Sequence, residues 1–202
     1  MKQLVMTMGV AAMVAASAFG GPITYTTADS QICLGADGCG MSTQLFGGVS
    51  VSYIPVASNT VNPSLLGSKS TFGSLGALMI SCVGGGTDCA AVTLPSNLFL
   101  YIHVGQTVPT VGAGVIPGSV LAGAIAGSAS NATVTWPIAN AITIGNITYS
   151  VANNPLAIVP PSSKGGVTSI QGLITENTVP EPATYAMLAS GLLAMGLARR
   201  RR

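Results

Sequence analysis

The segment "SNLFLYIHVGQT", residues 96–107, decides the fold. Aliphatic residues occupy every second position in it: Leu98, Leu100, Ile102 and Val104. The positions between them carry Phe99, Tyr101 and His103, so both faces of the segment are largely apolar. A two-residue period with two apolar faces is typical of a strand inside a sheet. The segment therefore predicts a central, well-buried β-strand.

Shorter segments with similar alternation lie on both sides of it along the chain. They are "VSVSYIPV" (49–56), "SVLAGAIAGSAS" (119–130), "NATVTWP" (131–137), "AITIGNITYSV" (141–151) and "GVTSIQGLIT" (166–175). Segment 119–130 is rich in alanine, but each glycine costs about 1 kcal/mol inside a helix, which favours a strand. Pro55 favours an edge position for the first segment. Gly145-Asn146 predicts either a hairpin turn or a bulge.

Clusters of Gly, Pro, Asn and Ser separate these strands, as is typical of loops. They include "VNPSLLGS" (61–68), "PTVGAGVIPGS" (109–119) and "ANNPLAIVPPSSKGG" (152–166). Gly112-Ala113-Gly114 is therefore assigned to a loop, because the spacing and βαβ context of a dinucleotide-binding turn are missing. The expected fold is all-β, a jelly-roll-like β-sandwich formed by an ectodomain of residues 19–178. A domain of that size buries roughly 70% of its unfolded surface.

Four cysteines fit an oxidising compartment. Cys33 and Cys39 bracket "LGADG", and Cys82 and Cys89 bracket "VGGGTD", two segments rich in Gly and Asp. Four cysteines allow three connectivities, of which local pairing within each loop is expected. A zinc site is the rival hypothesis, but it usually needs thiols about two to four residues apart. No metal is therefore expected.

Charge is scarce, since only 6% of the 202 residues are charged. Between the two ends, at residues 19–178, the chain has four acidic residues and two lysines, which give a formal charge of −2. They are Asp29, Asp37, Asp88, Glu176, Lys69 and Lys164. Nucleic-acid binding depends on basic groups that neutralise phosphates. The ectodomain is therefore not expected to bind nucleic acid.

The first 18 residues have the three parts of a secretory signal peptide. Lys2 supplies a positive charge, and residues 4–16 form an apolar helical region. Ala16 and Ala18 place small residues at the two positions that signal peptidase recognises. Cleavage before Phe19, and hence export, is expected.

The last part of the chain predicts a membrane anchor. Residues 183–198 carry no charge, and as a helix they would rise about 24 Å, somewhat less than the hydrocarbon core. Four basic residues follow: Arg199, Arg200, Arg201 and Arg202. By the positive-inside rule these arginines stay in the cytoplasm and act as a stop signal for a single transmembrane helix. The ectodomain would then lie outside the cell.

An extended Pro-Glu-Pro segment, an apolar helix and an arginine cluster occur in that order within residues 179–202. Together they resemble the PEP-CTERM sorting signal. The sorting motif carried over is Val179, Pro180, Glu181 and Pro182. Its two prolines keep the backbone extended and remove two N–H donors. The resemblance implies recognition by exosortase, a membrane-embedded processing enzyme of Gram-negative bacteria, with transient anchoring in the inner membrane and transfer to the cell surface or beyond.

Residue types that carry catalysis are few. His103 is the only histidine and lies in the most apolar segment, which favours a structural role. The four acidic residues of the ectodomain are scattered and show no metal-binding spacing. A hydrolase with paired carboxylates is the weakest hypothesis, since it needs these residues to converge in a cleft.

The sequence thus predicts a non-enzymatic, exported protein of the cell envelope or extracellular matrix, without a cofactor. The resemblance implies association with an exopolysaccharide matrix, as in a biofilm, where a structural or adhesive role is expected. The alternative is a carbohydrate-binding module. Trp136, the only tryptophan, is the candidate for sugar stacking, if it is exposed in a groove beside tyrosines.

Overall fold

The computed structural model describes residues 21–35, 38–63, 69–137, 140–177 and 190–191. The signal peptide predicted at residues 1–18 lies outside this part of the chain. So does the sorting signal predicted at 179–202, apart from Ser190 and Gly191, which are helical. The described residues include no helix long and apolar enough to cross a membrane. Residues 21–176 form one compact unit, which is described here by itself.

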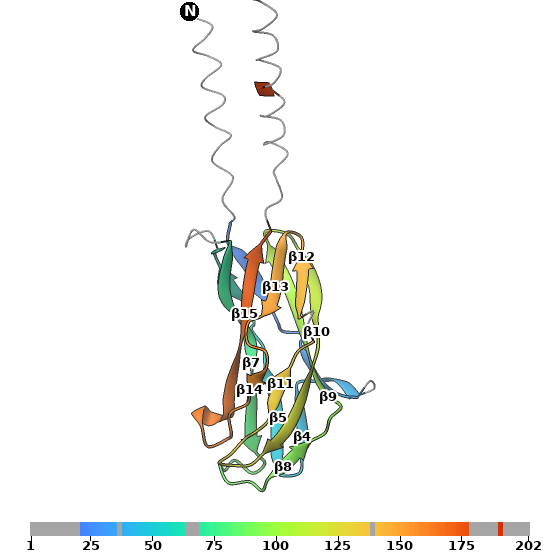
Figure 1. Ribbon diagram of the computed structural model, residues 1–202, viewed down its shortest axis with the longest axis vertical. Coiled ribbons are helices and arrows are strands. Elements are labelled where there is room, and N and C mark those ends of the chain that lie inside the picture. The colour runs from blue at the N-terminus through green and yellow to red at the C-terminus, as the bar shows by residue number, and fades with distance from the viewer. Residues whose placement is uncertain (1–20, 36–37, 64–68, 138–139, 178–189, 192–202) are drawn as a thin grey trace, which may run out of the picture. The chain divides into compact units, whose positions relative to one another are not determined.

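Two antiparallel sheets form this unit, as expected for a β-sandwich (Figure 1). The main path of the nine-stranded sheet is β14 (Leu156–Ala157), β11 (Thr133–Thr135), β10 (Gly112–Ile125), β9 (Leu98–Val108), β1 (Ile23–Thr26) and β6 (Asn59–Val61). In addition, β2 (Gln31–Leu34) pairs with β9 and β3 (Gly38–Met41), and β8 (Val92–Leu94) pairs with β10. The six-stranded sheet has the order β12 (Ala141–Ile144), β13 (Ile147–Val151), β15 (Val167–Glu176), β7 (Ser70–Cys82), β5 (Val49–Ile54) and β4 (Thr43–Phe46).

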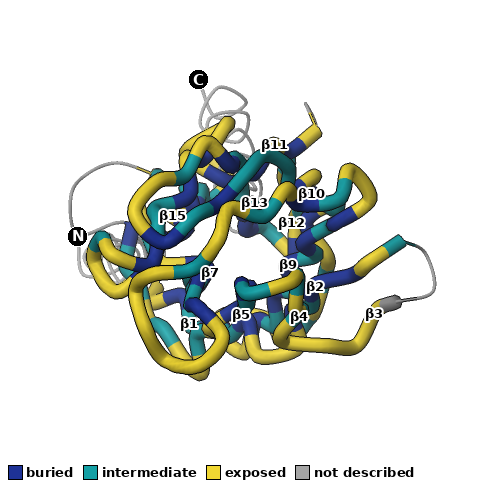
Figure 2. Tube along the Cα trace, turned by 90° about the horizontal axis from the view of Figure 1, so that it is seen from below, coloured by how far each residue is buried: buried dark blue, intermediate teal, exposed yellow. Residues whose placement is uncertain are grey.

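Strand β9 is the central strand that its sequence predicts. It pairs with β10 on one side and with β1 and β2 on the other. Its alternate aliphatic side chains are almost completely buried: Leu98, Leu100, Ile102 and Val104. Figure 2 shows that buried residues occupy the interior between the sheets, whereas exposed residues gather in the connecting loops.

The prediction of a loop at residues 109–119 is wrong for most of these residues. Strand β10 begins at Gly112 and pairs with β9 from there, with a register shift between Ile116 and Ser119. Pro117 lies at this irregularity, where the ladder does not need its missing N–H. The glycines allow close packing of the two sheets, because a Cβ on Gly112 would lie 2.5 Å from Cγ2 of Ile144.

Two other local predictions have different outcomes. Strand β5 is not at an edge, because β4 pairs with its outer side and the strand ends before Pro55. Gly145-Asn146 forms the turn of the β12–β13 hairpin, where Gly145 has φ +61°. The hairpin alternative is therefore confirmed.

A bulge in β7 organises the polar part of the core. Leu75 and Gly76 stand opposite the single residue Ile170, and Gly76 has φ +109°. At this bulge, two backbone carbonyls of β7 accept hydrogen bonds from the hydroxyl groups of buried tyrosines. Tyr25 of the nine-stranded sheet donates to the Ser74 carbonyl at 2.7 Å. Tyr53 of the six-stranded sheet donates to the carbonyl of Leu75.

A third buried tyrosine links the sheets. The Tyr149 ring lies edge-on to the Tyr25 ring, with 5.4 Å between ring centroids. Its hydroxyl donates to Oε1 of Gln106 at 2.7 Å, and Gln106 is itself buried. Burial raises the pKa of Tyr25 to about 12, although its hydrogen bond with Asn59 opposes the shift. Burial likewise raises the pKa values of Tyr53 and Tyr149.

We expect the free energy of unfolding to fall as the pH rises above 10. The unfolded chain releases tyrosine protons near pH 10, whereas folded Tyr25 keeps its proton up to about pH 12. The contribution of each buried tyrosine to the free energy of unfolding is therefore fully present below pH 10, and above it this contribution falls by up to about 1.4 kcal/mol per pH unit. Urea unfolding followed by Trp136 fluorescence between pH 8 and about pH 11 measures this slope. Tyr25→Phe should make the slope shallower. A slope equal to that of the unmodified protein would contradict the assignment.

Candidate functional site

The last strand leads directly into the predicted sorting segment. Strand β15 is an interior strand, hydrogen-bonded to β13 and β7, and Glu176 pairs with Ile147. The Glu176 N–H also donates to the Lys69 carbonyl at 2.7 Å. Glu176, two residues before position 178, is therefore held within the sheet. The predicted sorting, signal-cleavage and basic residues themselves lie outside the described residues: Val179, Pro180, Glu181, Pro182, Ala16, Ala18, Arg199, Arg200, Arg201 and Arg202.

Both predicted disulfides are confirmed. Cys33 is bonded to Cys39 across the β2–β3 hairpin, and Cys82 is bonded to Cys89 at the end of β7. No free cysteine occurs in the described part of the chain. Each bridge closes a short local loop and should contribute roughly 2–3 kcal/mol to stability by restricting the unfolded chain.

Two of the candidate acidic residues, Asp88 and Glu176, lie far apart in the fold. Asp88 follows the C-terminal end of β7, whereas Glu176 lies beside its N-terminal end, where Thr175 pairs with Ser70. The backbone N–H of His103 lies 3.0 Å from Oγ of Ser30, and its half-buried side chain lies on the outer face of β9. Among the described residues, no group of three or more His, Cys, Asp or Glu could hold a metal ion.

The sugar-stacking prediction for Trp136 is wrong. Its side chain is only 3% exposed and belongs to the hydrophobic core. Asn154 fixes the backbone at this position, accepting from the Trp136 N–H at 3.1 Å and donating to the Trp136 carbonyl at 3.0 Å. An aromatic ring held inside the sandwich cannot present a face to a glycan. Alternation within "NATVTWP" places it there, since Ala132, Val134 and Trp136 are all buried.

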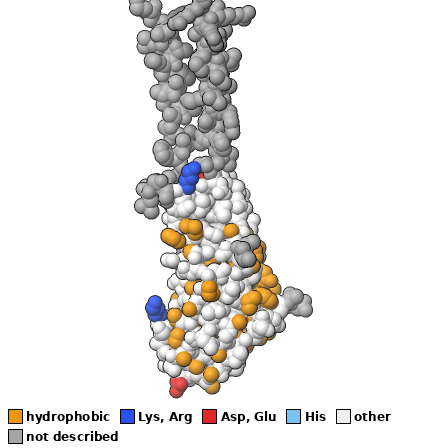
Figure 3. Space-filling model, in the orientation of Figure 1, with side chains coloured by type: hydrophobic (Ala, Val, Ile, Leu, Met, Phe, Trp, Pro, Cys, Tyr) orange, Lys and Arg blue, Asp and Glu red, His pale blue; other side chains and the backbone are white. Residues whose placement is uncertain are grey.

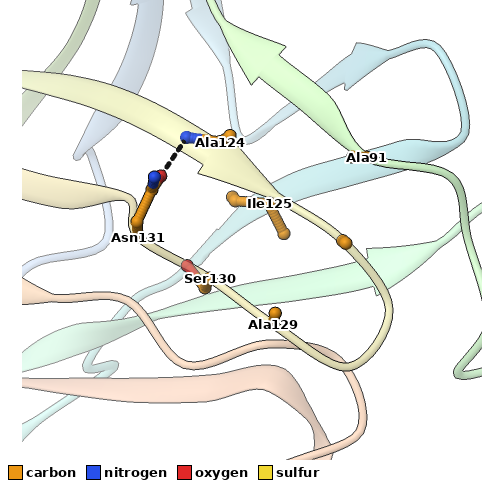
Figure 4. Close-up of a pocket in the computed structure, with 7 residues that line it drawn as sticks. Ala91, Ala124, Ile125, Ala129, Ser130 and Asn131 are labelled. Carbon is orange, nitrogen blue, oxygen red and sulfur yellow. Dashed lines mark hydrogen bonds between the residues drawn. The ribbon is translucent and has the colours of Figure 1, made fainter.

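One pocket, of about 280 Å³, lies beside the end of β10 (Figure 4). Small apolar side chains dominate its lining. Its two polar side chains already bind the local backbone: Asn131 Oδ1 accepts from the Ala124 N–H at 2.6 Å, and Ser130 Oγ accepts from the Ala132 N–H at 3.2 Å. These groups hold the turn after β10 in place. The pocket therefore offers few free polar contacts to a ligand.

A second hollow, of about 270 Å³, lies on the outer face of the six-stranded sheet. It forms at the β7 bulge and is lined by Phe72, Gly73, Ser74, Ser169, Ile170 and Gln171. Phe72 is 63% exposed, whereas Ser74, Ser169 and Gln171 are exposed polar residues beside it. None of the lining residues is charged. An exposed aromatic ring next to hydroxyl and amide groups can stack on an apolar face and exchange hydrogen bonds at the same time.

The surroundings of this hollow are also almost uncharged. Several cross-strand pairs on the outer face of the same sheet join two hydroxyl residues, such as Thr43 with Ser52 and Thr143 with Thr148. Figure 3 shows a surface dominated by uncharged polar side chains and backbone, with dispersed hydrophobic side chains and very few charges. Sequence reasoning missed Phe72 because strand β7 was not recognised. The signal was a single aromatic residue on the polar side of "STFGS", residues 70–74.

The described domain is an all-β sandwich with two disulfides. Residues 178–202 match the family model of the PEP-CTERM protein-sorting motif, so the chain carries this motif, as its sequence predicted. The motif implies an extracellular protein that is sorted by exosortase after membrane-anchored transit. No curated protein and no solved structure shows significant similarity to the chain.

Proposed function

We propose that the chain is a non-catalytic matrix protein of a Gram-negative envelope, with an adhesive role toward exopolysaccharide. Exosortase would release it from the inner membrane, and the β-sandwich would then bind neutral glycan. The observation that supports this proposal most directly is the Phe72 hollow on an uncharged, hydroxyl-rich face. In the carbohydrate-binding hypothesis, Phe72 replaces the buried Trp136 as the aromatic residue that would stack on a sugar ring.

The chemistry of the hollow suits a neutral sugar unit. A pyranose ring has an apolar C–H face and a rim of hydroxyl groups. Phe72 offers a flat apolar surface for the ring face, and Gln171 offers an amide that both donates and accepts for the hydroxyls. Ser74 Oγ accepts from the Gly76 N–H at 3.2 Å, which leaves its own O–H free to donate. An anionic polymer would find no cationic partner among the lining residues.

We expect Phe72→Ala to weaken glycan binding by up to about tenfold, because it removes the stacking surface. Binding of the exported protein to dextran, laminarin and the polysaccharide of the producing cells is measured by affinity electrophoresis. Phe72→Tyr should retain binding. Leu45→Ala is the matched control, since Leu45 is also exposed on the outer face of this sheet but lies outside the hollow. Equal binding by Phe72→Ala and the unmodified protein would exclude the hollow as the glycan site.

A further inference from the structure

The first strand of the domain begins, and its last strand ends, at the same end of the sandwich. Strand β15 ends there at Glu176, opposite Ile147, and β1 begins there, with Thr24 paired to Val108. Figure 1 shows β12, β13 and β15 reaching this upper end together. The β9–β10 loop lies at the same end, since a Cβ on Gly145 would lie 2.5 Å from Oγ1 of Thr110.

The β9–β10 loop presents aliphatic side chains to solvent. Val111 is 87% exposed and Val108 is 40% exposed, and Pro109 between them is also exposed. Of the two valine side chains, that of Val111 is the more exposed. A loop with exposed aliphatic side chains and no charged residue can insert into the boundary between lipid headgroups and acyl chains, because no charge has to leave water.

The loop is held in place from inside the core. The amide Nε2 of buried Gln106 donates to the Thr110 carbonyl at 2.9 Å and contacts Thr110 Oγ1 at 3.0 Å. The Gln106 Oε1 atom accepts from the Tyr149 hydroxyl at 2.7 Å, so the amide cannot easily turn away. Val111 is therefore presented in a fixed direction, which lowers the conformational cost of inserting it into another surface.

The length of the connecting chain brings this end close to the membrane. Seven residues lead from Glu176 to Ala183, the first residue of the uncharged segment. Even fully extended, they span only about 25 Å. The headgroup layer occupies roughly 5 to 8 Å on each side of a bilayer. While the chain is anchored, Glu176 can therefore lie no farther than about 25 Å from the start of the uncharged segment, which leaves the lipid surface within reach of this end of the domain.

We infer that the Val108–Val111 loop contacts the membrane surface during anchored transit and inserts Val111 into the headgroup layer. The partner is a lipid surface, bound through apolar contact rather than through charge. The inference rests on membrane-anchored transit, which the sorting motif implies, and is independent of glycan binding.

The test uses the full chain reconstituted in phosphatidylcholine vesicles. Val111→Cys is labelled with an environment-sensitive fluorophore, while the native cysteines remain in their disulfides. Ser128→Cys is the matched control, because Ser128 is exposed and follows the opposite end of β10. We expect spin-labelled lipids to quench the probe at position 111 several-fold more than at position 128, with no change at high salt.

Flotation of the vesicles separates the two ways in which this inference can fail. If the full chain does not float with the vesicles, anchoring itself is wrong and the inference falls with it. If the chain floats but positions 111 and 128 are quenched equally, anchoring stands and the loop contact is overturned. Quenching that disappears at high salt would overturn the apolar character of the contact. Glycan binding through Phe72 would remain untouched by any of these results.

Discussion

Gly166→Ala should lower the free energy of unfolding by at least about 3 kcal/mol more than Gly165→Ala. Both glycines have left-handed backbones, with φ +72° and +62° respectively, so alanine is strained at either position. That strain alone costs roughly 1–2 kcal/mol. The difference lies in the space around each Cβ. At Gly165 nothing lies within 4 Å, whereas a Cβ at Gly166 would lie 1.9 Å from the carbonyl oxygen of Ile80.

The clash cannot be relieved by a side-chain rotation, because the opposing atom belongs to the backbone of β7. Residues 164–166 form a short 3-10 turn that leads into β15, the neighbour of β7. Alanine at Gly166 would therefore push the start of β15 away from the centre of its sheet. Urea unfolding with the buried Trp136 as reporter measures both variants. Equal losses for the two substitutions would show that backbone strain, and not the contact with Ile80, determines their cost.

Glu181→Ala should abolish processing of the tail and leave the protein in the membrane. Glu181 is the only charge between the domain and the arginine cluster, and it lies within the matched motif. The substitution keeps both flanking prolines, so the extended backbone is retained. Glu176→Ala is the matched control, since this acidic residue lies just before the motif, in β15. Fractionation of cells that contain exosortase, with an antibody against the ectodomain, distinguishes anchored from released protein.

Neutral replacements of Arg199–Arg202 should act differently, because they weaken the orientation of the anchor rather than its recognition. Each arginine contributes about 1 kcal/mol through anionic lipids. These variants should reach the wrong topology or leave the membrane without cleavage. Normal processing of both the Glu181 and the arginine variants would mean that the tail is an ordinary anchor, and that exosortase does not read this motif.

Local patterns predicted much of the fold. The alternation in β9, the glycine turn between β12 and β13 and the two short cysteine loops each depend on neighbours in the sequence, and all three are confirmed. Strand β10 was only partly predicted, because Gly112, Gly114 and Pro117 indicate a loop unless the opposite sheet is known. The space at Gly112 and Gly114 is limited by Ile142 and Ile144, which approach from the other sheet.

The candidate site was harder to predict for the same reason. Trp136 and Phe72 are both aromatic residues in alternating segments, and the sequence alone does not say which face of each strand is buried. Burial is decided by pairing across the sheets, which placed Trp136 in the core and left Phe72 beside a bulge. The bulge itself depends on register between β7 and β15, two strands far apart in the chain.

The position of β15 also determines how the protein would bear tension. Phe72 stands opposite Leu173, only three residues before the strand ends at Glu176. A pull between a glycan held at Phe72 and a tail held at the membrane would therefore enter the sheet at the β7–β15 pair. Hydrogen bonds of an antiparallel pair run perpendicular to the strands, so such a pull shears several of them together instead of opening them one by one.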